Sequence, residues 1–272
     1  MKKCGIVAVA LSVISLLSAT PALAQEGELS AAEVANANNP LASMKAFNVH
    51  NYYTPSLSGV DGTANTFWFR YAQPVGRFLV RLSVPLPTVP LGGAAPPTVP
   101  ADPTSDSVSG VGDLNIFAAY LAVSEPAKTF GFGPLLAAPT ATNEALGSEK
   151  WQGGVAAVFF KATPVVQYGG LLTWQASFAG EEERDDTNVV VAQPFAMFQI
   201  GGGTYLRTAP LWVFNIEQDT YHIPFGFGIG QVLKQGNTVF NIFIEPQFTI
   251  LHKGVGQPRF QLFMGMNTQF GG

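Results

Sequence analysis

The stretch that decides the fold is the last one, Phe260-Gln261-Leu262-Phe263-Met264-Gly265-Met266-Asn267-Thr268-Gln269-Phe270. Its side chains alternate between two kinds, with Phe260, Leu262, Met264, Met266 and Phe270 on one face and Gln261, Gly265, Asn267 and Gln269 on the other. Successive side chains of a β-strand point to opposite sides, so this stretch predicts a strand with one apolar and one polar face. Residues 238–250 repeat the pattern: Phe240, Ile242, Ile244, Phe248 and Ile250 alternate with Asn241, Glu245, Gln247 and Thr249.

The start of the chain predicts export. Basic Lys2 and Lys3 precede an apolar run from Gly5 to Leu17, and Ala22-Leu23-Ala24 forms a small-x-small cleavage site. We therefore expect residues 1–24 to be a secretory signal peptide and exclude them from the fold. Cys4 is the only cysteine and lies within this segment, so the mature chain is expected to have no disulfide and no thiol chemistry.

Composition separates a membrane barrel from a soluble β-sandwich, which would also alternate. The chain is 47% hydrophobic and only 12% charged, about half the usual charged share. Without Lys2 and Lys3 it has 12 basic (14 − 2) and 18 acidic residues, a net charge of −6 that argues against nucleic acid as a partner. No stretch after residue 24 approaches the ~20 apolar residues of a membrane helix. An exported chain of this kind predicts a closed antiparallel transmembrane β-barrel of the outer-membrane type.

About twelve strands are expected over residues 45–270, at 46–54, 65–73, 77–85, 112–122, 129–138, 151–160, 165–178, 189–199, 204–214, 221–232, 238–250 and 259–270. Connections after even-numbered strands are tight, and those after odd-numbered strands are mostly longer and more polar. An even strand count with short turns on the periplasmic side and long loops outside is typical of bacterial outer-membrane barrels. The apolar face predicts lipid contact, with candidates that include Phe67, Phe69, Tyr71, Phe78, Leu82, Ile116, Tyr120, Tyr168, Leu172, Trp174, Phe178, Tyr221, Phe225, Phe227 and Ile229.

Residues 25–44 form an N-terminal arm before the barrel. Ser30-Ala31-Ala32-Glu33 fits a capping box and predicts a short helix over 31–37. This segment either lies in the periplasm or enters the barrel mouth, or remains a loose arm.

The polar face predicts the lining of the lumen. Its titratable members, and the candidates for a constriction that selects solutes, are His50, Arg70, Arg77, Arg81, Asp113, Arg207, His222 and Glu245. Arg70, Arg81 and Asp113 fall on three consecutive expected strands, so we expect charge pairing across them. The alternative is that these charges only satisfy one another and fill the barrel. Inward glycines at 226, 228 and 230 leave space for a ligand, a plug or, as the favoured interpretation, a bend in the wall.

Other chemistry finds little support in the sequence. The acidic loop tip, with Glu181, Glu182, Glu183, Asp185 and Asp186, is a weak candidate for divalent cations that bridge to lipopolysaccharide; a solvated charge run is the simpler interpretation. No metal-binding histidine spacing, nucleophile elbow or phosphate-binding glycine loop is present, so no cofactor is expected. An enzyme at the barrel rim would need a nucleophile beside His50 or His252.

An ordered series of motifs resembles the outer-membrane family described as transporters of the meta-pathway of phenol degradation. The series is Ser109-Gly110-Val111-Gly112-Asp113-Leu114, Gly131-Phe132-Gly133-Pro134, Leu136–Thr142, Leu146–Gln152, Gln193-Pro194, Pro224–Gly230 and Glu245-Pro246-Gln247-Phe248. The resemblance implies a barrel of about twelve strands that passes small, often hydrophobic or aromatic molecules. It assigns no residue roles. One departure is that Gly271-Gly272 follows Phe270, where many outer-membrane barrels end on the aromatic residue.

Together these observations predict an outer-membrane channel for passive, selective passage of small molecules, and not an enzyme. A lumen of this strand number can be nearly filled by side chains, which favours selective diffusion over bulk flow. The expected partners are outer-membrane lipid and lipopolysaccharide, a small solute and, during biogenesis, the outer-membrane assembly machinery. The alternatives are a plugged barrel with a structural or surface-interaction role and, less favoured, a rim enzyme.

Overall fold

The computed structural model describes residues 30–41, 44–91, 107–125 and 127–270. The expected signal peptide and the Gly271-Gly272 terminus lie outside these residues. In the described part of the chain, no helix is long and apolar enough to cross a bilayer.

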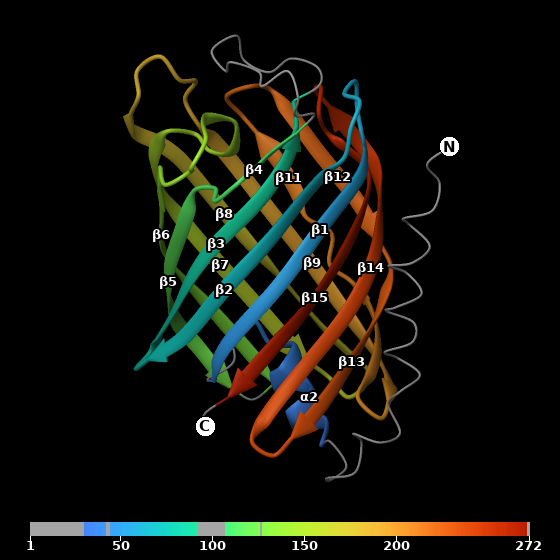
Figure 1. Ribbon diagram of the computed structural model, residues 1–272. Coiled ribbons are helices and arrows are strands. Elements are labelled where there is room, and N and C mark those ends of the chain that lie inside the picture. Colours follow the sequence, from blue (N-terminus) through green and yellow to red (C-terminus); the bar gives the residue numbers. More distant parts are fainter. Residues whose placement is uncertain (1–29, 42–43, 92–106, 126, 271–272) are drawn as a thin grey trace, which may run out of the picture.

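The fold is a closed antiparallel β-barrel (Figure 1). Its strands are β1 (Lys45–Leu57), β2 (Ala64–Val75), β3 (Phe78–Pro90), β4 (Ser107–Ser109), β5 (Leu114–Glu125), β6 (Lys128–Ala138), β7 (Lys150–Ala162), β8 (Val166–Gly180), β9 (Asn188–Gly201), β10 (Thr204–Thr208), β11 (Trp212–Asn215), β12 (Thr220–Gly226), β13 (Gly228–Gln235), β14 (Thr238–Lys253) and β15 (Pro258–Phe270). The last strand closes on the first: β15 pairs with β1 from Lys45 opposite Phe270 to Tyr53 opposite Leu262.

These segments make twelve barrel strands, as the sequence predicts. β10 and β11 both pair with β9, and β12 and β13 both pair with β14, so each couple is one interrupted strand. The first interruption contains Pro210, which has no N–H to donate to a neighbouring strand. β4 was not expected from the sequence; it extends the sheet by pairing with the end of β3.

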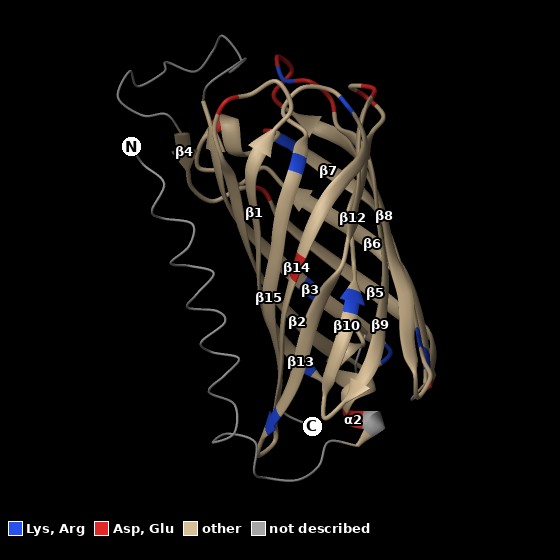
Figure 2. Cartoon of the chain, turned by 90° about the vertical axis from the view of Figure 1, so that its right-hand side faces the viewer, with Lys and Arg blue, Asp and Glu red and all other residues tan. Residues whose placement is uncertain are grey.

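Turn length distinguishes the two ends of the barrel. Residues 76–77, 163–165, 202–203 and 236–237 connect strands in tight turns at one end, where β15 also finishes. We call this the short-turn end, and the opposite end, with the connections 58–63, 139–149, 181–187 and 254–257, the loop end. In Figure 2 the acidic residues gather at the loop end.

The outer face is apolar, as predicted. Exposed side chains there include Phe67, Phe78, Phe132, Leu172, Trp174, Phe225, Ile242 and Phe248. Leu172, near the middle of β8, is 52% exposed. A belt of this kind avoids contact with water only when hydrocarbon surrounds it. The sequence and structure therefore agree on a transmembrane barrel of the outer-membrane type.

One helix lies in the interior of the barrel. α2 (Ala31–Asn38) sits within the short-turn end of the barrel, at the bottom of Figure 1. Both halves of its capping box form: the Ser30 hydroxyl accepts from the Glu33 N–H, and the Glu33 carboxylate accepts from the Ser30 N–H at 2.9 Å. The helix starts at Ala31 because these bonds satisfy N–H groups that the first turn leaves unpaired.

Candidate functional site in the barrel interior

An ion pair surrounded by aromatic rings lies inside the barrel. Arg207 Nε on β10 lies 2.8 Å from Glu245 Oε2 on β14, and these residues are 5% and 0% exposed. The Arg207 guanidinium also lies over the Phe243 ring at 3.6 Å and near the Phe263 ring at 5.1 Å. A buried carboxylate of this kind needs both a cation and further donors.

Glu245 has those donors. Its Oε1 accepts from the Ala209 N–H at 2.9 Å and from Gln247 Nε2 at 2.7 Å, and Gln261 in turn donates to Gln247 Oε1 at 2.6 Å. Hydrogen bonds to charged groups are the stronger ones in a low-dielectric interior. The network therefore holds Glu245 through Arg207 on β10, the Ala209 backbone after β10 and Gln247 on its own strand.

The inward glycines let neighbouring side chains reach across a strand. Gly228 lies directly between Arg207 and the β14 backbone, and a Cβ on it would come within 2.8 Å of the Glu245 Cβ. A Cβ on Gly230 would lie 2.2 Å from Tyr205 Cζ, and Tyr205 reaches over this glycine to bond Asn241. The space that these glycines leave is thus filled by side chains of β10 and β14, and the bend in the wall stays a prediction.

A second group of basic residues follows a diagonal across β1, β2 and β3. Arg70 Nη1 donates to His50 Nδ1 at 2.6 Å, and His50 Nε2 contacts Asn267 Oδ1 at 2.7 Å. Since a guanidinium can only donate, His50 accepts on Nδ1 and is the neutral Nε2–H tautomer that donates to Asn267. Arg81 Cζ lies 4.3 Å over the Phe117 ring, and Arg70 Cζ lies 4.7 Å over the Trp68 ring.

His222 lies nearer the loop end. Its Nε2 is 2.8 Å from Thr249 Oγ1, and that hydroxyl donates to the Pro258 carbonyl. Because the Thr249 proton is committed to a carbonyl, this pair holds the β12, β14 and β15 ends together. The partners of His50 are an amide and a guanidinium, so no nucleophile stands beside it among the described residues.

One of the predicted lumen charges, Arg77, is not in the lumen, and Asp113 makes other contacts than expected. Arg77 lies in the turn between β2 and β3, is exposed, and donates to the Tyr120 hydroxyl at 3.1 Å. The prediction was wrong because a tight turn, not a strand, carries this residue. Asp113 precedes β5 and does not pair with Arg70 or Arg81, contrary to expectation.

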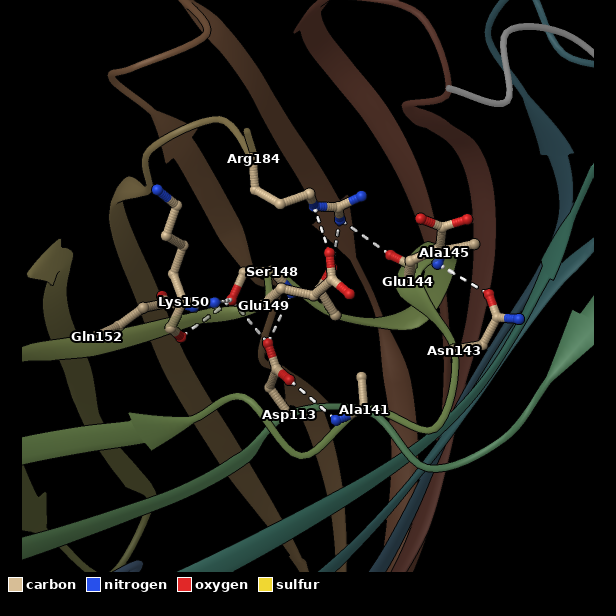
Figure 3. A network of polar contacts seen from close by, with 11 residues as sticks. Asp113, Ala141, Asn143, Glu144, Ala145, Ser148, Glu149, Lys150, Gln152 and Arg184 are labelled. Atoms are coloured by element: carbon tan, nitrogen blue, oxygen red, sulfur yellow. Dashed lines mark hydrogen bonds and ion pairs between the residues drawn. The ribbon is translucent and has the colours of Figure 1, made fainter. Parts of the chain in front are cut away.

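Asp113 organises a loop instead (Figure 3). Its Oδ2 accepts from both the N–H and the hydroxyl of Ser148 at 2.8 Å, and its Oδ1 accepts from the N–H groups of Thr140 and Ala141 at 3.1 and 3.2 Å. Four donors leave little capacity for a cation. The carboxylate ties the 139–149 connection to the start of β5.

The acidic loop 181–187 is held by ion pairs. Arg184 Nε lies 3.2 Å from Glu149 Oε2, and its Nη2 donates to the carbonyls of Glu144 and Gly147 at 2.9 Å (Figure 3). Asp186 lies 3.3 Å from Lys150 Nζ, and a hydrogen bond from Ser177, with Lys150, lowers the pKa of Asp186. In the part of the chain that the structure describes, the loop candidates for cation binding, Glu181, Glu182, Glu183, Asp185 and Asp186, form no group of three metal-binding side chains.

Residues 30–41 lie inside the short-turn end and pack against its inner surface, and we call them the plug. Val34 and Ala37 pack against Met197, Tyr205, Val232 and Val239, while Leu41, 1% exposed, enters an apolar cluster with Leu79, Phe117, Leu121 and Leu135. A Cβ on Gly131 would lie 3.0 Å from Leu121 Cδ2 and 3.4 Å from Leu41 Cδ1, so this inward glycine lies beside the plug.

Polar contacts fix the plug to opposite walls. Asn38 donates to Gln167 on β8 at 2.8 Å, and Asn39 donates to Thr129 on β6 at 3.1 Å. Asn241 on β14 donates to Asn38 Oδ1 at 2.7 Å, and Gln269 on β15 donates to the Asn36 carbonyl at 2.9 Å. Lys234 Nζ lies 2.5 Å from Glu33 Oε1, and this hydrogen bond lowers the pKa of Glu33 from 4.5 to about 2.

The sequence reading missed the aromatic side chains of the interior. Tyr52, Trp68, Phe117, Phe243 and Phe263 all lie on strand positions of inward parity, and Tyr52 stacks on Phe263 with ring centroids 4.3 Å apart. Parity alone would have found them, since each alternates with an outward neighbour. These residues were not predicted to line the interior because only polar side chains were assigned to the inward face.

The fold is similar to those of solved outer-membrane proteins. No family model and no curated protein matches the sequence. An outer-membrane channel from Pseudomonas putida F1 is 15% identical, with a TM-score of 0.58 over 85% of this chain and 97% of that chain. The NanC porin is 10% identical, with a TM-score of 0.53 over 83% of this chain and 99% of that chain. At such identities the likeness shows a shared fold.

Proposed function

We propose that this protein is an outer-membrane channel through which small molecules, aromatic ones among them, pass by selective diffusion. One observation carries the proposal: above the plug, many inward side chains keep contact with solvent. Asn48, Trp68, Arg70, Arg81, Gln175 and Gln193 are all half-buried although they point into the barrel. A purely structural barrel would be expected to fill this level completely.

We infer the direction of the barrel from its two ends. Short turns and termini on the periplasmic side are the arrangement of bacterial barrels, so the short-turn end with α2 and the end of β15 would face the periplasm. Export by the signal peptide, insertion by the outer-membrane assembly machinery and contact of the acidic loops with lipopolysaccharide belong to this proposal. The motif series that resembles the meta-pathway phenol-degradation family supports aromatic molecules as the substrate class.

Passage requires the plug to move. The plug is held by side-chain hydrogen bonds, each contributing about 1 kcal/mol net, by the Lys234–Glu33 ion pair and by the apolar packing of Val34, Ala37 and Leu41. The strand pairing of the wall is independent of it, since β1 begins at Lys45, after the plug. Displacement of residues 30–41 would therefore open the short-turn end without breaking the barrel.

The test is conductance of the purified protein in planar bilayers. We expect small steps from the native chain and larger or more frequent steps when residues 30–41 are replaced by a Gly/Ser linker of equal length. In an N38C/Q167C variant, whose native side chains are 2.8 Å apart, a short bifunctional thiol reagent is expected to suppress the steps. The single variant N38C, treated in the same way, is the control. Silence of the native and linker variants, with unchanged solute uptake in a deletion strain, would refute the channel.

A plugged barrel with a structural or surface role is the second candidate. It is favoured by the plug itself and by the buried Arg207–Glu245 pair, which occupy the interior at two levels. The two functions separate in the cross-linking experiment. A plugged barrel predicts that cross-linking changes neither conductance nor uptake, whereas a channel loses both.

A further inference from the structure

The charges of the barrel interior do not balance. Among described strand residues the only acidic side chains are Glu125, at the end of β5, and Glu245. Glu245 is committed to Arg207. Arg70 and Arg81 also point inward, and no carboxylate of the described residues lies within 4.0 Å of either. With His50 neutral, this level of the interior carries a net charge of +2.

The two guanidiniums face the same region. Arg70 lies opposite Ser83, and Arg81 lies two residues before Ser83 on β3, so the arginines are diagonal neighbours on the inner surface. Such neighbours are about 7 Å apart at the backbone, within reach of one small ligand. Cation–π contacts orient both guanidiniums, since Arg70 lies over the Trp68 ring and Arg81 lies over the Phe117 ring.

Most of their donors are free in the described structure. A guanidinium has five N–H donors. Arg70 uses Nη1 for His50, and Arg81 makes no hydrogen bond within the described residues, with its buried Nε left without a partner. Two like charges and an orphaned buried donor are unfavourable unless something supplies negative charge and acceptors.

The acidic loops do not supply that charge. They lie at the loop end, and in physiological salt the field of an exposed charge fades over about 8 Å. Interior charges are screened much less, so Arg70 and Arg81 dominate the potential that a solute meets inside the barrel.

We propose that Arg70 and Arg81 form a binding site for a small aromatic carboxylate. The carboxylate oxygens accept from the free guanidinium N–H groups, which match a carboxylate in geometry. The half-buried rings of Trp68 and Tyr52 give the apolar body of the ligand a surface to pack on. This inference rests on the proposed function and narrows its substrate class to anions.

Binding is tested without transport, by calorimetry of the detergent-solubilised protein with benzoate. Benzyl alcohol, similar in shape but neutral, is the matched ligand. We expect benzoate to bind, benzyl alcohol to bind at least tenfold more weakly, and R70Q and R81Q each to weaken benzoate about tenfold. R77Q, an arginine in the exposed turn, is the matched control and is expected to bind like the native protein.

A second measurement separates binding from folding. Because R81Q removes an unpaired charge, it is expected to unfold at the same or a higher temperature without ligand, while losing the rise that benzoate gives the native protein. Equal affinity for benzyl alcohol, or full benzoate affinity in R70Q and R81Q, would overturn the site. If the protein binds benzoate but shows no conductance, the binding site is supported and the channel is refuted. If the protein conducts without preferring anions and does not bind benzoate, the channel is supported and the binding site is refuted.

Discussion

Arg207 reaches Glu245 across a whole strand, because Gly228 lies between them and has no side chain to block the way. The pair is therefore a contact between strands β10 and β14 that are not neighbours at this point. It crosses β13 next to the interruption at Phe227, between the end of β12 at Gly226 and the start of β13 at Gly228.

Glu245→Gln tests how much this ion pair contributes to the free energy of unfolding. Removing one partner of a buried ion pair leaves the other charge unpaired, so the free energy of unfolding should fall by about 3 kcal/mol. Denaturant unfolding in detergent micelles measures it. Glu125→Gln, at the turn end of β5, is the control and should change stability by less than about 0.5 kcal/mol. The double variant R207L/E245L should lose less than E245Q, and an equal or larger loss would argue against an unpaired charge as the cause.

Asp113→Asn should loosen the loop end and leave the barrel folded. An amide has one acceptor oxygen, so it cannot accept from Ser148, Thr140 and Ala141 together. The 139–149 connection would then release its contacts with Arg184, and trypsin should cut after Arg184 several times faster. Asp61→Asn, in another loop of the same end, serves as the control. Unchanged cleavage in D113N would mean that the loop is held by its other contacts.

Acid should loosen the plug. The pKa of Glu33 is lowered to about 2 by Lys234, so the stability that this contact adds is fully present above pH 4.5 and is lost as the pH falls toward 2. The contact is a third exposed, which limits its contribution to about 1 kcal/mol or less. Reaction of a cysteine in place of Val34 with a thiol reagent that works in acid should quicken over this range. With Glu33→Gln added, the rate should already be raised at pH 7 and should change less with pH; an identical pH profile would exclude Glu33.

The outer belt can be tested with two adjacent residues. Leu172 faces outward near the middle of β8, and Thr173 faces the interior. An arginine facing lipid at mid-depth costs about 2–4 kcal/mol, so L172R should unfold more readily in lipid bilayers, whereas T173R should be tolerated. If both variants behaved alike, the assignment of the two faces would be wrong.

The sequence alone determined the barrel. Alternation with period two is a local property, so the strand number, the inward and outward faces and the long and short connections could be predicted residue by residue. Phe248 and Gln247 illustrate this, since one is 60% exposed and its neighbour is fully buried. The capping box of Ser30 and Glu33 likewise predicted where α2 begins.

The tertiary structure decided which residues meet. Closure of the barrel brings Asn38 next to Gln167 and Asn241, and Asp113 next to Ser148. These partners are far apart in the sequence, and the alternation of side chains does not predict which of them meet. Parity could not show that Arg77 occupies a turn, nor that Arg70 and Arg81 lack a carboxylate. Those outcomes depend on register, on glycines that let side chains cross a strand, and on a helix that folds back into the barrel. All three are long-range properties of the closed sheet, and for that reason the contacts between interior side chains became visible only in the folded chain.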